Sequence, residues 1–166
     1  MIKRLIAASL LPLLVACENN TASSPLVGNW ITESCERLED ANGQPLDYWM
    51  RGLYEFSSEG KIRRGMRSYE DANCQSQVLY EAPGSLGVAM TFEDLGEAFL
   101  QEGLDGRRLR VSLGSPPLAL EVEGYYFIDD KRVCFSEAFR FHATGAGISG
   151  PSADAIDFGN CLRRGS

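Results

Sequence analysis

The stretch Leu26-Val27-Gly28-Asn29-Trp30-Ile31-Thr32 has the composition of a β-strand and starts the folded part of this 166-residue chain. Branched and aromatic side chains dominate it, and such residues are enriched in strands. The preceding residues 18–25 carry no apolar side chain large enough to pack in a core, and such a tract stays flexible in solution. We therefore expect one folded domain over residues 26–166, joined to a tether.

After this strand, short apolar runs alternate with turn residues, and no long apolar repeat of 3.6 residues indicates an amphipathic helix. Further strands are expected at residues 52–56, 61–69, 77–80, 88–92, 108–113, 118–122, 125–128, 132–135 and 156–163. Asp105-Gly106 predicts a type I′ hairpin turn. Residues 95–100 fit either one helical turn or a strand edge, and the Gly-rich residues 139–151 predict a long loop.

Many short strands joined by tight turns predict an all-β domain, either an antiparallel barrel or a two-sheet sandwich. The chain offers little helix to cover exposed strand edges, and closure into a barrel removes those edges. We therefore expect a small antiparallel β-barrel of about eight or more strands in meander order.

The N-terminus has the parts of a secretory signal: the cations Lys3 and Arg4, an apolar run over residues 5–15, and the small residue Ala16. The run is shorter than the roughly 20 residues of a membrane-spanning helix. The motif Leu14-Val15-Ala16-Cys17 resembles the lipobox of bacterial lipoproteins. In that family the cysteine thiol is diacylglycerylated, the chain is cut before it, and the new amine receives a fatty acid such as palmitate.

The lipobox resemblance implies a signal peptide over residues 1–16 and a lipidated Cys17 that begins a tether over residues 17–25. Each buried methylene contributes about 0.8 kcal/mol, so several acyl chains on one residue would hold the domain firmly to a membrane. Residue 18 is glutamate, and in enterobacterial lipoproteins the absence of aspartate at this position favours the outer membrane. The resemblance thus implies a periplasmic position at the outer membrane.

Four cysteines remain besides Cys17, an even number that predicts two disulfides in an exported chain. They are Cys35, Cys74, Cys134 and Cys161. Four cysteines allow three connectivities, and their spacing does not choose among them. A zinc site needs closely spaced ligand pairs, which these cysteines lack, so we expect neither metal nor cofactor.

Gly28-x-Trp30 is similar to the G-x-W motif that opens the first strand of lipocalins. Together with Cys35 and Tyr69-x-Asp71-x-x-Cys74, it resembles small secreted lipocalin-like domains of bacteria over residues 26–82. The resemblance implies that Gly28 and Trp30 plug one end of the barrel, with Arg163 or Arg164 over the tryptophan. It also implies the disulfides Cys35–Cys74 and Cys134–Cys161. The chain lacks the T-D-Y motif of true lipocalins, which argues against an open ligand cup.

No catalytic constellation is visible, so the sequence predicts a protein that is not an enzyme. His142 is the only histidine, and neither G-x-S-x-G nor H-E-x-x-H occurs. The net charge is −7, and removal of Lys3 and Arg4 with the signal would leave −9, which disfavours nucleic acid as a partner.

Two functions follow from these expectations. The lipocalin resemblance implies a membrane-anchored protein that binds a small apolar or amphipathic ligand in the cell envelope. The alternative is a protein-interaction or inhibitor module that uses rim loops at residues 36–50 or 139–153. A carrier needs an apolar internal cavity of about 300 Å³ or more, whereas an interaction module would have a filled barrel and an exposed apolar or aromatic patch.

Overall fold

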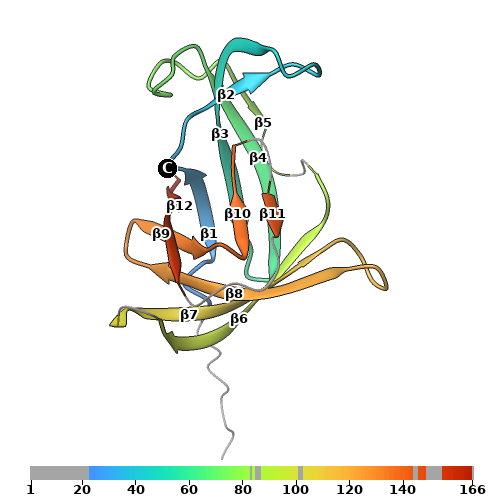
Figure 1. Ribbon diagram of the computed structural model, residues 1–166, viewed down its shortest axis with the longest axis vertical. Coiled ribbons are helices and arrows are strands. Elements are labelled where there is room, and N and C mark those ends of the chain that lie inside the picture. The colour runs from blue at the N-terminus through green and yellow to red at the C-terminus, as the bar shows by residue number, and fades with distance from the viewer. Residues whose placement is uncertain are drawn as a thin grey trace, which may run out of the picture.

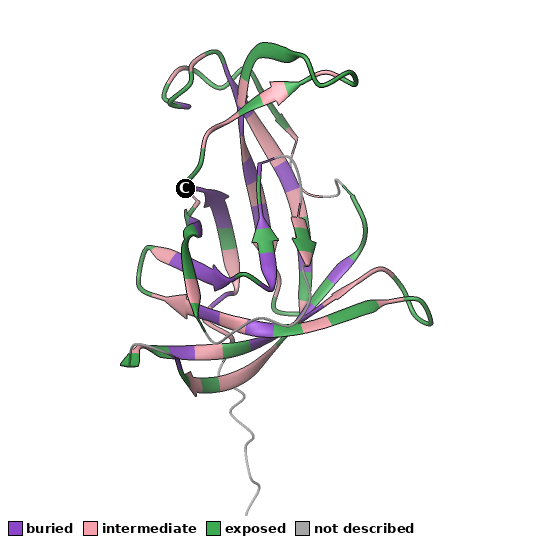
Figure 2. Cartoon of the chain, viewed as in Figure 1, coloured by how far each residue is buried: buried purple, intermediate pink, exposed green. Residues whose placement is uncertain are grey.

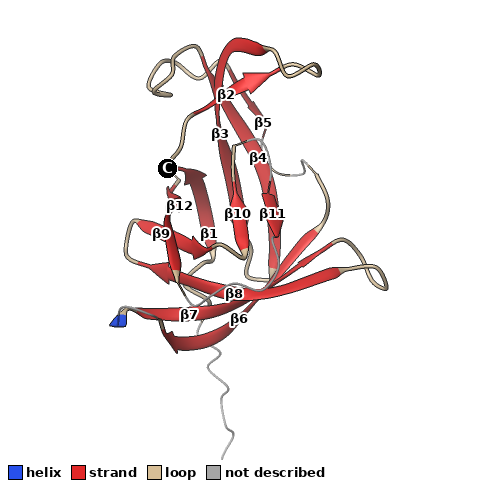
Figure 3. Ribbon diagram, viewed as in Figure 1, coloured by secondary structure: helices blue, strands red, loops and turns tan. Residues whose placement is uncertain are grey.

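The computed structural model describes residues 23–82, 84, 87–100, 103–143, 146–148 and 155–165. The predicted signal peptide, Cys17 and the tether up to residue 22 lie outside the described residues. Nearly all regular structure is β (Figure 3). Among the residues described, no helix has the length and apolar character needed to cross a bilayer.

The described residues form twelve strands. These are β1 (Gly28–Thr32), β2 (Glu36–Glu39), β3 (Pro45–Phe56), β4 (Lys61–Tyr69), β5 (Tyr80–Ala82), β6 (Met90–Phe99), β7 (Asp105–Leu113), β8 (Leu120–Ile128), β9 (Arg132–Ser136), β10 (Phe139–Phe141), β11 (Ala146–Ile148) and β12 (Ile156–Arg164).

Eight of these strands close into an antiparallel barrel, as the sequence predicts (Figure 1). The neighbour order around it is β1-β3-β4-β6-β7-β8-β9-β12, and β12 pairs with β1 to close the ring. Each barrel strand therefore lies beside the next barrel strand in the chain, which is a meander. Of the four remaining strands, β2 pairs with β3 and β5 pairs with β4, and Figure 1 shows both at the upper end of those two long strands.

The core lies inside the barrel because side chains alternate between its two faces. Along β3, burial alternates from Trp49 to Phe56, and the even-numbered residues point inward. Figure 2 shows the buried positions recurring along the barrel strands, with exposed residues at the hairpin ends. The largest fully buried side chains include Trp30, Tyr54, Phe56, Tyr126 and Phe135.

The long loop expected over residues 139–151 is wrong for its described part. Strands β10 and β11 pair as a separate two-stranded sheet, the inner hairpin, and Phe139 and Phe141 are buried. The ring of Phe141 lies 4.5 Å from that of Phe135 and 5.1 Å from that of Tyr54, measured between centroids. The inner hairpin thus inserts two aromatic rings into the barrel.

Two barrel glycines leave room for the segment that carries the inner hairpin. A Cβ on Gly52 would lie 2.7 Å from the carbonyl oxygen of His142, and one on Gly124 would lie 2.7 Å from Phe139. The side chain of Asn160 fixes the same segment, since it accepts a hydrogen bond from the Phe141 amide and donates one to the Phe139 carbonyl. The hairpin is therefore held by both packing and polar contacts.

Several strand boundaries differ from the sequence expectation. Asp105 and Gly106 lie inside β7, and the turn before them is closed by a hydrogen bond from the Leu100 amide to the Leu104 carbonyl. Residues 95–99 belong to β6, which settles the open alternative in favour of strand, with a bulge between Asp94 and Gly96. The expected strand at 77–80 is reduced to β5, which starts at Tyr80, and the two expected strands at 118–128 form the single strand β8.

Candidate functional site

The buried indole of Trp30 lies under the guanidinium group of Arg164. The indole is 1% exposed, and the guanidinium carbon lies 4.0 Å from the ring centroid, a cation–π contact. The indole Nε1 donates a hydrogen bond to the Leu26 carbonyl at 2.7 Å. Of the two arginines that the resemblance offered for this place, the structure has Arg164.

Gly28 makes this arrangement possible. Its φ is +136°, and a Cβ there would lie 2.5 Å from Nη1 of Arg164. The same guanidinium donates hydrogen bonds to the carbonyls of Val27 and Pro25, both at 3.0 Å. Arg164 thus joins the C-terminal strand to the segment through which the chain enters the barrel.

Asp94 forms a second link to that entry segment, one that sequence reasoning missed. Its carboxylate accepts hydrogen bonds from the hydroxyls of Ser24 and Tyr126, both at 2.8 Å, and from Nε of Arg107 at 3.1 Å. Burial opposes ionisation of Asp94, but these donors and the Gly96 amide outweigh it and hold the pKa of the carboxyl below its usual value.

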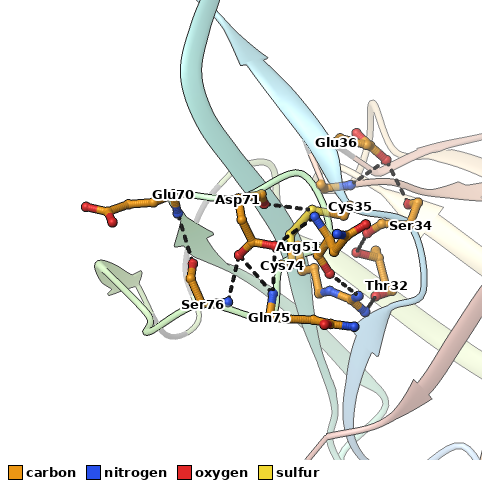
Figure 4. Close-up of a disulfide and its surroundings, with 12 residues drawn as sticks. Thr32, Ser34, Cys35, Glu36, Arg51, Glu70, Asp71, Cys74, Gln75 and Ser76 are labelled. Atoms are coloured by element: carbon orange, nitrogen blue, oxygen red, sulfur yellow. Dashed lines mark hydrogen bonds between the residues drawn. A yellow bond between two sulfur atoms is a disulfide. The ribbon is translucent and has the colours of Figure 1, made fainter.

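Both disulfides have the pairing that the resemblance implied. Cys35 follows β1 and Cys74 follows β4, so this bridge joins two strand ends at one rim (Figure 4). The bridge Cys134–Cys161 joins directly opposed residues of β9 and β12. The second bridge therefore crosslinks β9 and β12 at a position where the two strands are already paired.

Asp71 shapes the turn that presents Cys74, as Figure 4 shows. Its carboxylate accepts hydrogen bonds from the backbone amides of Asn73, Gln75 and Ser76, the last at 2.6 Å. Hydrogen bonds from Ser76, followed by those from the other amides, lower the pKa of Asp71 to about 2. This residue has a structural role in the turn.

A groove of about 410 Å³ lies on the outer face of the barrel over β1, β3, β4 and the end of β12. Its floor is a row of residues in direct register, Ile31 opposite Leu53 and Leu53 opposite Gly65. These three residues alternate with the inward-facing Trp30, Tyr54 and Arg64, so they point away from the lumen. Gly65 contributes no side chain to the floor.

Charged residues surround this apolar floor, which makes the groove polar at its edges. The lining includes the arginines 63, 67, 163 and 164 and the glutamates 55 and 81. Arg67 is paired with Glu81 at 2.7 Å, and Arg63 lies 3.6 Å from Glu55. Arg163 stands opposite Ile31 on β12, is exposed, and has no ion-pair partner among the described residues.

Arg51 lies beside the groove, opposite Arg67 on the neighbouring strand. Its guanidinium donates to the carbonyls of Thr32 at 3.0 Å and Asn73 at 3.3 Å, next to the Cys35–Cys74 bridge (Figure 4). The buried Nε has no partner in the described structure. Burial lowers the pKa of Arg51, and repulsion from Arg163 lowers it further.

The remaining chemical candidates do not form a reactive set. Nδ1 of His142 lies 3.5 Å from Glu36, and its backbone carbonyl accepts a hydrogen bond from Tyr54 at 2.7 Å. Burial raises the pKa of Tyr54 to about 12, so the phenol remains a donor at neutral pH. Within the described ranges, no group of three or more His, Cys, Asp or Glu side chains could hold a metal ion.

No protein-family model, curated protein or solved structure matches this chain. Function is therefore inferred from the site geometry. The groove is the feature that sequence reasoning missed, since its floor and rim come from strands far apart in the chain. The only available signal was the presence of Arg63, Gly65 and Arg67 at alternate positions of one predicted strand.

Proposed function

We propose that this chain is a non-catalytic binding protein of the bacterial envelope, anchored through lipidated Cys17 at the periplasmic face of the outer membrane. It binds a small amphipathic molecule in the groove on the outside of its barrel. A ligand site inside the lumen is disfavoured, because aromatic rings from the barrel and the inner hairpin pack together there.

The observation that carries this proposal is the contrast between a packed lumen and an outer groove of about 410 Å³. Ligand pockets commonly measure about 300–1,000 Å³ and combine an apolar lining with a few polar groups. Leu53 and the largely covered Ile31 supply the apolar lining here, and the surrounding arginines and glutamates supply the polar groups. An amphipathic molecule matches that division.

The predicted anchor supports a role close to a lipid surface. Six residues separate Cys17 from Ser24, whose hydroxyl is bound by Asp94, and Pro25 is bound by Arg164 at the end of the groove. An extended chain covers at most about 3.5 Å per residue, so the tether would keep this end of the domain within roughly 25 Å of the acyl chains.

The test is native mass spectrometry of the protein released from membranes in a mild detergent, with and without a groove-blocking substitution. We expect a bound small molecule in the wild type and its loss in Gly65→Leu, whose side chain would project over the floor. Gly147→Leu is the matched control, because a Cβ at Gly147 meets no atom within 4 Å. A molecule that remains bound to Gly65→Leu would contradict the groove as the site.

A second function, protein interaction, is favoured by an exposed patch at the barrel rim. Leu46 and Tyr48 lie on the same face of β3 as Met50, which lies opposite Ser68, and Ser68 lies opposite Tyr80. Tyr48 and Tyr80 therefore share one face, and they are 49% and 60% exposed. Crosslinking in cells, followed by comparison of wild type with the variant Tyr48→Ser/Tyr80→Ser, would test whether this face contacts another envelope protein.

A further inference from the structure

The groove concentrates positive charge on an acidic protein. The whole chain has 16 lysines and arginines against 23 aspartates and glutamates, a net charge of −7. The groove lining has four arginines against two glutamates, which reverses that ratio. Because clefts focus the field of the charges that line them, the groove is expected to attract anions although the protein as a whole repels them.

The side of the groove near the Cys35–Cys74 bridge carries arginines that have no ion-pair partner among the described residues. Arg51 and Arg67 face each other there across β3 and β4, and Arg51 is repelled by Arg163 and attracted by the carboxylates of Glu33 and Asp71. Glu81 neutralises Arg67, but no carboxylate among the described residues pairs with Arg163. At the opposite end, Arg63 and Glu55 balance each other beside Asn29.

We propose that the groove selects amphipathic anions, with a carboxylate or phosphate head group beside Arg67 and Arg163 and an apolar part on Ile31, Leu53 and Gly65. This proposal rests on the proposed function and adds the charge of the ligand to it. An anion at this place would offset the repulsion between Arg51 and Arg163 and bind the guanidinium of Arg163, which has no ion-pair partner among the described residues. A neutral or cationic amphipath would gain only the apolar contact.

The test is isothermal titration calorimetry of residues 17–166 carrying Cys17→Ser, with three probes that share one chain length. The probes are decanoate, decanol and decyltrimethylammonium, each below its aggregation or solubility limit. We expect decanoate to bind more tightly than decanol, and decyltrimethylammonium to bind most weakly. The preference for decanoate should shrink as salt rises, because exposed charges are screened.

Charge-neutralising variants locate the head group. Arg163→Gln should weaken decanoate binding by roughly fivefold, the effect of one exposed charge, and leave decanol binding unchanged. The matched control is Arg140→Gln, which removes an exposed arginine from β10, outside the groove lining. Arg140→Gln should leave the affinity for all three probes unchanged. Equal losses of decanoate affinity in Arg163→Gln and Arg140→Gln would overturn the assignment of the head group to Arg163.

Two further arms separate a free anion from a lipid head group that carries the same charge. Co-sedimentation with phosphatidylglycerol vesicles, compared with phosphatidylcholine vesicles, tests recognition at a bilayer. Decyl phosphate in solution tests recognition of a free molecule. Binding to the anionic vesicles or to decyl phosphate supports the proposal if Arg163→Gln weakens that binding and Arg140→Gln does not.

The outcomes also separate this proposal from the proposed function. Equal binding of decanoate and decanol, blocked by Gly65→Leu, would contradict anion selectivity and leave a groove that binds amphipaths. Binding of none of the probes, in solution or on vesicles, would contradict both. Decanoate binding that persists in both Gly65→Leu and Arg163→Gln would place the ligand elsewhere and would also contradict both.

Discussion

The position of the Arg164 side chain depends on the absence of a side chain at Gly28. Gly28 has a φ of +136°, and a methyl group there would collide with the guanidinium that covers Trp30. We expect Gly28→Ala to lower the free energy of unfolding by about 1–3 kcal/mol, from backbone strain and the displaced arginine. Urea denaturation followed by tryptophan fluorescence would measure this loss.

A double-mutant cycle separates the two causes of that loss. If the collision with Arg164 matters, the double variant Gly28→Ala/Arg164→Ala should lose less free energy of unfolding than the two single variants lose together. Strict additivity would mean that strain at φ +136° is the whole effect and that the contact with Arg164 is incidental.

Asp94 predicts a dependence of stability on acid pH. Its folded-state pKa lies below the ordinary aspartate value of 3.8, so the ionised carboxylate stabilises the fold above that pH, and the contribution is lost as pH falls through the folded pKa. We expect Asp94→Asn to be less stable than wild type at pH 6. The difference between the two should shrink when thermal unfolding is measured below pH 3.8, and a constant difference would contradict the prediction.

The two disulfides that the lipocalin resemblance implied are present in the structure. Gly28, Trp30, Cys35 and Cys74 belong to the short motifs that carry the resemblance. Arg51, Gly65 and Arg163 acquire their role only through strand pairing across β12, β1, β3 and β4. Nothing in the linear sequence marks these three residues as neighbours.

The inner hairpin is the element on which the packed lumen depends. Phe141 contacts the rings of Tyr54, Phe56 and Phe135, and it is buried. We expect Phe141→Ala to lower the free energy of unfolding by about 3–5 kcal/mol, the usual cost of a deleted core aromatic ring. Chemical denaturation would measure it.

Binding provides the control for this variant. Phe141 is not part of the groove lining, so folded Phe141→Ala should keep the decanoate affinity of the wild type. A loss of binding in the folded variant would indicate that the ligand occupies the lumen after all.

The same hairpin shows why elements were harder to predict than the fold class. Strands β10 and β11 have three residues each, too few for an alternating pattern to stand out in a Gly-rich segment. Asp105-Gly106 predicted the turn at the wrong place, since hydrogen bonds from the Leu100 amide to the Leu104 carbonyl and from the Gly103 amide to the Leu100 carbonyl close the turn before this pair. By contrast, the barrel followed from many short strands joined by tight turns, a pattern repeated along the domain.

For the whole molecule, the predicted anchor should control where the protein resides. We expect Cys17→Ala to abolish labelling by a radioactive fatty acid and to move the protein from the membrane to the soluble fraction. The barrel itself should remain folded, with both disulfides formed, because residue 17 lies outside them. Unchanged labelling and fractionation of Cys17→Ala would contradict a lipid anchor at this cysteine.

An outer binding site on a packed barrel is tested most directly by methyl NMR during a decanoate titration. Ile31 and Leu53 form the groove floor, whereas Val111 and Val133 are buried inside the barrel. We predict saturable shifts of the Ile31 and Leu53 methyl signals, with those of Val111 and Val133 nearly unchanged. Shifts confined to Val111 and Val133 would place the ligand in the lumen and contradict a binding site on the outer face.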